Sequence, residues 1–183
     1  IVRTRTQKYL KKKRERVIII GVKASIKNEF TYPEENPNMV YLKDILKDVP
    51  DSPGSVYPQR KAEIMSLVPQ GGCWVDLPKD IQLEYMGERS MAAGGGKRGM
   101  ARRLSMNEQC LTLTTSPCQK QTERCHPTET RPLTTREYAR IQTFPDSYKF
   151  EGGTGNIYKQ IGNAVPVELA HAVATQITTF LKS

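Results

Sequence analysis

One apolar run, Val17-Ile18-Ile19-Ile20-Gly21-Val22, constrains the fold more than any other part of the chain. A continuous β-branched run of this kind is typical of a strand buried on both faces, as in a parallel sheet. Such a strand needs neighbours, and the rest of the sequence offers few candidates for them. We therefore expect an α/β chain that supplies only part of a sheet.

The chain is strongly basic, with 28 Lys and Arg against 19 Asp and Glu and a formal charge of +9. This excess makes a polyanion the expected partner, and nucleic acid is the commonest one. An anionic membrane is a weaker alternative, because the basic residues do not follow one face of a long amphipathic helix. No run is long enough to span a membrane and no signal-peptide pattern opens the chain, so we expect a cytoplasmic protein without a membrane partner.

Local patterns predict the other elements. Helices are expected over 41–46, 61–68 and 134–144, and the last helix should begin near Pro166. Residues 109–116 alternate as a strand would, and turns are expected at 71–72 and 151–156. Thr134 and Glu137 have the spacing of a capping box. The final helix carries an apolar stripe made of Ala170, Val173, Ala174, Ile177 and Leu181.

Residues 91–104, MAAGGGKRGMARRL, combine glycines with basic side chains. One interpretation is a loop with ordinary surface charge. The other is a DNA-contacting loop, in which Arg98, Arg102 and Arg103 meet phosphates or guanine edges. The net charge does not decide between them.

The triplet Pro117-Cys118-Gln119 raises the question of a cysteine nucleophile. The four cysteines are widely spaced, which predicts neither a disulfide framework nor a metal site. A zinc site would need Cys118 together with Cys110, Cys125 and His126, although ligand pairs normally lie a few residues apart. His126 is expected in a loop, where it could contact a phosphate or a base.

Three ordered blocks carry a family resemblance. They are 12–16, KKRER, then 131–145, RPLTTREYARIQTFP, and 158–166, YKQIGNAVP. In this order they closely resemble the last three signature blocks of bacterial DNA (cytosine-5) methyltransferases. The patterns R-x-L-T-x-x-E-x-x-R-x-Q-x-F-P and Q-I-G-N-A-V-P are highly specific. The middle of the chain, roughly 45–115, lies where that family keeps its variable target-recognition region.

The resemblance implies roles for particular residues. Arg16 matches the arginine that reaches the flipped cytosine, and Arg14 matches its neighbour. Asn163, Ala164 and Val165 match the turn that lines the S-adenosylmethionine pocket. Lys12 stands where the family usually has Gln, so no role of that Gln is carried over.

The resemblance also implies DNA and domain contacts. Thr112 and Leu113 match the pair that braces the DNA backbone beside the extruded nucleotide, and Lys120 is expected at DNA nearby. Arg131 and Arg140 match arginines that tie the recognition region to the catalytic domain.

Other family blocks are not found in this sequence: the Gly-rich cofactor loop, the Gly-Gly that precedes Pro-Cys-Gln, and Glu-Asn-Val. In the family these blocks lie before the position of Lys12. The family nucleophile also precedes the Arg-rich strand, whereas Cys118 follows it, so Cys118 is interpreted as a look-alike in the recognition region. We expect a partner polypeptide, or the remainder of the chain, to supply the missing blocks, and we expect this chain alone to be inactive.

The expected fold class is α/β: the C-terminal portion of a doubly wound methyltransferase domain with a small, irregular, strand-containing recognition domain. Residues 1–28 would supply a strand and a cleft segment, 29–130 the recognition domain, 131–161 a hinge, and 162–183 the cofactor turn and terminal helix. The implied function is recognition of double-stranded DNA and transfer of a methyl group from S-adenosylmethionine to C5 of a flipped cytosine, in a restriction–modification system. The alternative is a non-catalytic DNA-binding module derived from such an enzyme.

Overall fold

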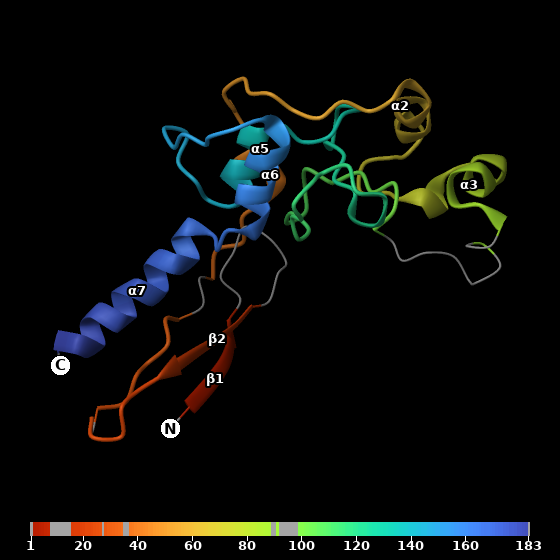
Figure 1. Ribbon diagram of the computed structural model, residues 1–183. Coiled ribbons are helices and arrows are strands. Elements are labelled where there is room, and N and C mark those ends of the chain that lie inside the picture. The colour runs from red at the N-terminus through yellow and green to blue at the C-terminus, as the bar shows by residue number, and fades with distance from the viewer. Residues whose placement is uncertain are drawn as a thin grey trace.

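The computed structural model describes residues 2–7, 16–26, 28–34, 37–88, 91 and 99–182, with backbone alone for 2–7, 16 and 17. Figure 1 shows three parts along the molecule. A β-ribbon and helix α7 (Val167–Lys182) lie at one end, α5 (Thr135–Ile141) and α6 (Thr154–Asn163) lie in the middle, and α2 (Gln59–Ser66) and α3 (Lys79–Met86) lie at the other end.

The apolar run forms a strand, β2 (Arg16–Gly21), as the sequence predicts. Its partner is β1 (Val2–Gln7), and the pairing is antiparallel, with Thr4 opposite Ile19. The expected parallel neighbour is therefore not found among the described residues, and Ile19 is 60% exposed. Strand β1 was not predicted, although Val and Thr alternate with Arg there as in an edge strand.

Four predicted helices are confirmed: α1 (Leu42–Ile45), α2, α5 and α7. Two helices were missed. Helix α3 follows Pro78 and ends at Gly87, whose φ of +81° suits a glycine after a helix. Helix α6 begins inside the predicted Gly-rich turn and carries the third sequence block. Two single 3-10 turns are also described, Trp74–Asp76 and Lys120–Thr122.

The predicted strand over 109–116 is wrong, because within the described residues this extended segment joins no sheet. The carbonyl oxygen of Thr112 instead accepts hydrogen bonds from Nε and Nη2 of Arg124, at 3.0 and 2.6 Å. The buried guanidinium of Arg124 therefore makes the hydrogen bonds to Thr112 that the backbone of a neighbouring strand would otherwise make.

The buried apolar side chains form two clusters. The central cluster joins α1, α5 and α6 with Leu104, Cys110 and Leu113. The distal cluster joins α2, the Trp74 turn and α3 with Ala101 and Cys125. The central cluster thus binds the 104–113 segment to the helices of the second and third sequence blocks. None of the helices in the described ranges is long and apolar enough to cross a membrane.

Candidate functional site

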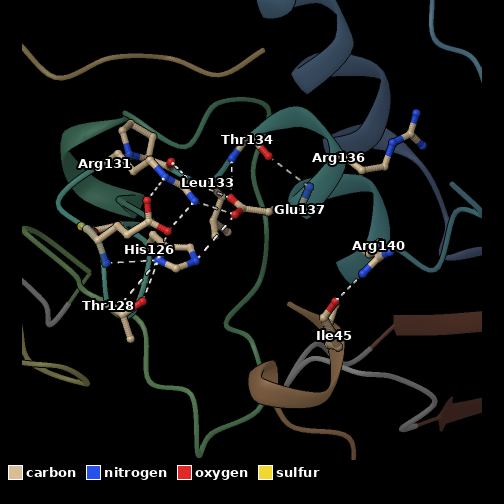
Figure 2. Close-up of polar contacts among 12 residues, drawn as sticks. Ile45, His126, Thr128, Arg131, Leu133, Thr134, Arg136, Glu137 and Arg140 are labelled. Atoms are coloured by element: carbon tan, nitrogen blue, oxygen red, sulfur yellow. Dashed lines mark hydrogen bonds and ion pairs between the residues drawn. The ribbon is translucent and has the colours of Figure 1, made fainter. Parts of the chain in front are cut away.

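The start of α5 is built around one carboxylate, that of Glu137, as Figure 2 shows. Thr134 and Glu137 form the predicted capping box, in which the backbone N–H of Thr134 donates to Glu137 Oε2 at 2.6 Å. Arg131 donates to both oxygens of the same carboxylate, each at 2.8 Å. A bidentate pair of this kind fixes orientation as well as distance. The R-x-L-T-x-x-E spacing is therefore what brings arginine, cap and carboxylate together.

His126 lies beside this pair and is buried. Its Nε2 is 3.6 Å from Glu137 Oε1, and its Nδ1 accepts from the backbone N–H groups of Thr128 and Glu129, at 3.3 and 3.2 Å. Burial lowers the pKa of His126 below its ordinary value, although Glu137 opposes this shift. These contacts make His126 an interior residue of the loop, which does not fit the suggestion that it contacts a phosphate or a base.

Arg140 joins α5 to the end of α1 (Figure 2). Its Nη1 donates to the carbonyl of Ile45 at 3.3 Å and its Nη2 donates to that of Asp48 at 2.9 Å, while Nε donates to Asp146 Oδ1 at 2.9 Å. The second block therefore contacts the 29–130 segment through Arg140 and also through Arg131, which pairs with Glu129 at 2.9 Å.

The third block ends in an open turn. Asn163 is the last residue of α6, and α7 begins at Val167. Asn163 is exposed, and its side-chain amide makes no hydrogen bond to the part of the chain that the structure describes. Val165 is 50% exposed and borders an apolar hollow of about 560 Å³, whose other lining residues are Ile18, Leu169, Ala170, Val173, Ala174 and Ile177.

The two neighbouring arginines of the basic loop have different surroundings. Arg103 is 5% exposed, and all five of its guanidinium N–H groups donate to protein oxygens, namely the carbonyls of Met65, Val68, His126 and Glu129 and the hydroxyl of Thr130. This full set of bonds corrects the expectation that Arg103 contacts DNA. Arg102 lies at the surface of a polar hollow with Gln70 and Asp76, where its Nη2 is 3.6 Å from Glu108.

The remaining predicted DNA residues also differ in exposure. Leu113 is fully buried in the central cluster, so its side chain does not reach a ligand. Thr112 is half-buried, and its carbonyl is held by Arg124. Lys120 is exposed, with Nζ 4.9 Å from the ring centre of Tyr85. Arg14 and Arg98 lie outside the described residues, and of Arg16 only the backbone in β2 is described.

Sequence reasoning missed a buried charge at Glu123. Its carboxylate is fully buried, 2.7 Å from Lys61 Nζ, and it accepts a hydrogen bond from the Tyr85 hydroxyl at 3.0 Å. Burial, together with the Glu123 charge, raises the pKa of Tyr57 and of Tyr85 above their ordinary value. This network ties α2 and α3 to the loop that carries Cys118. No local sequence signal marks it, because its members lie on separate elements.

Cys118 is half-buried beside this network. Burial raises the pKa of its thiol, although a bond to Ser55 and the charge of Lys61 oppose the shift. A nucleophilic cysteine needs the opposite change, because the thiolate is the reactive form. Among the described residues, no group of three or more His, Cys, Asp or Glu side chains could hold a metal ion.

The chain is similar in sequence to bacterial Type II methyltransferases. The chain is 57% identical over 180 residues to the Type II methyltransferase M.PspPI of Psychrobacter sp. (strain TA137), and 58% identical over 173 residues to M.Sau96I of Staphylococcus aureus. The alignments cover 93% and 92% of this chain but only 43% and 40% of those relatives, so the chain spans less than half of their length.

A solved structure supports the fold. It is a crystal structure of a proposed DNA modification methyltransferase encoded within an E. coli prophage, with a TM-score of 0.57 and 21% identity. The match covers all of this chain and 60% of that one. The family described as C-5 cytosine-specific DNA methylase matches residues 10–179. The chain therefore belongs to the C-5 cytosine-specific DNA methylase family.

Proposed function

We propose that this chain recognises the DNA target and completes the base and cofactor pockets of a DNA (cytosine-5) methyltransferase in a bacterial restriction–modification system. The observation that carries the proposal is the family match over residues 10–179, which includes all three sequence blocks whole. Relatives named as Type II methyltransferases support the restriction–modification context. The activity would take place in the cytoplasm, on double-stranded DNA.

Arg16 would act at the cytosine itself. The target base must leave the duplex before its C5 can be reached. A guanidinium at the end of β2 can then donate hydrogen bonds to the base O2 and can keep neighbouring acids in place. Arg14, two residues earlier, would support it from the same segment.

The turn 163–165 would form one wall of the cofactor pocket. S-adenosylmethionine would supply the methyl group there. The side chains fit such a ligand, because the Asn163 amide is exposed, is not engaged by the described residues, and can both donate and accept hydrogen bonds. Val165 adds exposed apolar surface beside it.

Lys120, which is exposed, and Arg102, which borders a polar hollow, would contact the DNA, and Arg98 is proposed for the same role from the sequence alone. Exposed basic side chains bind phosphates, and an arginine can also pair with a guanine edge in the major groove. Arg103 and Leu113 are left out of these contacts because both side chains are buried.

The apolar hollow between β2 and α7 would be covered by the rest of the methyltransferase domain, which would also supply the nucleophile, the cofactor loop and the acid. Ile177 and Leu181 of α7 are exposed together with Ile19 of β2. Exposed apolar surface on two adjacent elements is typical of an interface. In the proposed assembly, α7 and this strand region pack on a doubly wound sheet, whose other strands come from a partner polypeptide or from the remainder of the chain.

Replacing Arg16 with alanine distinguishes this enzyme from a non-catalytic DNA-binding module. In the assembled methyltransferase we expect turnover to fall by about 100-fold or more, while the Kd for duplex DNA changes by less than about threefold. Arg60→Ala is the matched control, because Arg60 is exposed on α2 and pairs only with Glu63 and Glu84 among the described residues. Unchanged turnover in Arg16→Ala would favour the binding module.

A further inference from the structure

Gln142, at the end of α5, makes hydrogen bonds to both flanks of the turn 163–165. Its side chain is fully buried, and Nε2 donates to the carbonyl of Ile161 at 2.9 Å, before the turn. Its own carbonyl accepts from the backbone N–H of Val167 at 3.2 Å, after the turn. One residue therefore fixes the separation between the end of α6 and the start of α7.

Thr143 adds a second attachment on the far side of the turn. Its Oγ1 accepts from the backbone N–H of Glu168 at 3.0 Å. The first N–H groups of a helix have no partners within it, and Pro166 offers no side-chain cap. Val167 and Glu168 are therefore capped from another segment, by Gln142 and Thr143.

The backbone at Thr143 supports a positioning role. Its φ is +63°, a left-handed conformation that is unfavourable for a β-branched residue. Such a conformation persists only where the surrounding structure imposes it, and it is concentrated at functional sites. The left-handed conformation of Thr143 lies just after the end of α5, and the Thr143 hydroxyl contacts the start of α7.

Two side chains of the turn are exposed and can contact a ligand. The flanks of the turn are held at Ile161, Val167 and Glu168, while the side chains of Asn163 and Val165 stay exposed. Holding a binding segment from behind lowers the ordering cost of ligand binding. We propose that Gln142 and Thr143 are positioning residues that set the affinity for S-adenosylmethionine without touching it. This inference rests on the proposed function.

Two substitutions test it in the assembled methyltransferase. Gln142→Met keeps the length of the side chain but removes the amide donor, and Thr143→Val keeps the branched shape but removes Oγ1. Each should raise the Kd for S-adenosylmethionine, measured by calorimetry without DNA, by about tenfold, since each removes a hydrogen bond that holds one flank of the turn, a buried one for Gln142 and an exposed one for Thr143. KM for the cofactor should rise in parallel, while kcat at saturating cofactor and the Kd for DNA stay within about threefold.

Two controls separate positioning from general destabilisation. Thr143→Ser retains the hydroxyl and should keep the wild-type Kd for the cofactor. Gln82→Met removes a comparable buried amide, which donates to the carbonyls of Val75 and Leu77 at 3.0 and 2.7 Å in the distal cluster. It should lower thermal stability yet leave cofactor affinity unchanged.

Cofactor affinity unaltered in both Gln142→Met and Thr143→Val would overturn the inference, as would an equal loss in Gln82→Met. If Gln142→Met does not fold, the inference is tested by the cofactor Kd of Thr143→Val compared with that of Thr143→Ser. A wild-type assembly that binds no S-adenosylmethionine would overturn the proposed function itself. A wild type that binds it, with variants that bind equally well, would overturn only the positioning role.

Discussion

Replacing Arg103 with methionine should lower the free energy of unfolding of the distal cluster by about 4 kcal/mol. The substitution removes five hydrogen bonds, to four carbonyls and one hydroxyl, and the bonds to the carbonyls of Met65, Val68 and His126 are buried. Buried acceptors without partners are costly, because water does not reach them. Urea denaturation followed by the fluorescence of Trp74, the only tryptophan of the chain and a member of this cluster, measures the effect.

The neighbouring residue provides the matched control. Among the described residues Arg102 pairs with the exposed Glu108 alone, at 3.6 Å, and its buried Nε has no hydrogen-bond partner there, so Arg102→Met should change stability by no more than about 1 kcal/mol. In the assembled methyltransferase it should instead weaken DNA binding, and the weakening should shrink at high salt because phosphate contacts release counterions. Equal destabilisation by both substitutions would contradict the different roles assigned to the two arginines.

Replacing Gly162 with alanine should destabilise the central cluster by about 3 kcal/mol. A Cβ atom at this position would lie 2.3 Å from the carbonyl oxygen of Thr114 and 2.9 Å from the Cα of Thr115. Both are backbone atoms, so either the end of α6 or the 112–115 segment would have to move. Because this contact lies between the cofactor turn and the segment predicted to brace DNA, affinity for both ligands should fall in the assembled methyltransferase.

Gly155→Ala in the same helix tests whether the stability change comes from the close contact at Gly162 or from helix propensity. A Cβ atom there meets nothing within 4 Å among the described residues. Alanine should therefore be neutral or slightly stabilising, by up to about 1 kcal/mol, because it is the better helix former. Thermal unfolding of the two variants in parallel gives the comparison. A Gly162→Ala protein as stable as Gly155→Ala would show that the close approach at Thr114 is not required.

The elements that the sequence predicted are those with local signals. The capping box of Thr134 and Glu137 and the proline before α7 each lie within a few residues of the helix that they start. Helix α6 was not predicted, because the glycines at its start favoured a turn. The 109–116 segment was misjudged because its alternation is that of a strand, whereas its partner is the Arg124 side chain, twelve residues away.

The site was predictable where a motif names the residue and not where tertiary packing decides its role. Arg102 and Arg103 are adjacent and chemically identical, yet Arg102 borders a polar hollow with one weak ion pair among the described residues, whereas Arg103 is buried with five hydrogen bonds. The same holds for Gln142, which the motif contains but whose two bonds across the cofactor turn depend on how α5 packs against α6 and α7. Glu123 has no sequence signal, because Lys61 and Tyr85 come from separate helices.

The chemical position of the transferred methyl group tests the central claim most directly. The assembled methyltransferase, containing these 183 residues together with the part that supplies the nucleophile and cofactor loop, is incubated with duplex DNA and S-adenosylmethionine labelled in its methyl group. The DNA is then digested to nucleosides, which are separated and identified by mass spectrometry. We predict label on C5 of deoxycytidine alone. Label on an exocyclic amino group of adenine or cytosine, or no transfer by an assembly that binds both ligands, would contradict it.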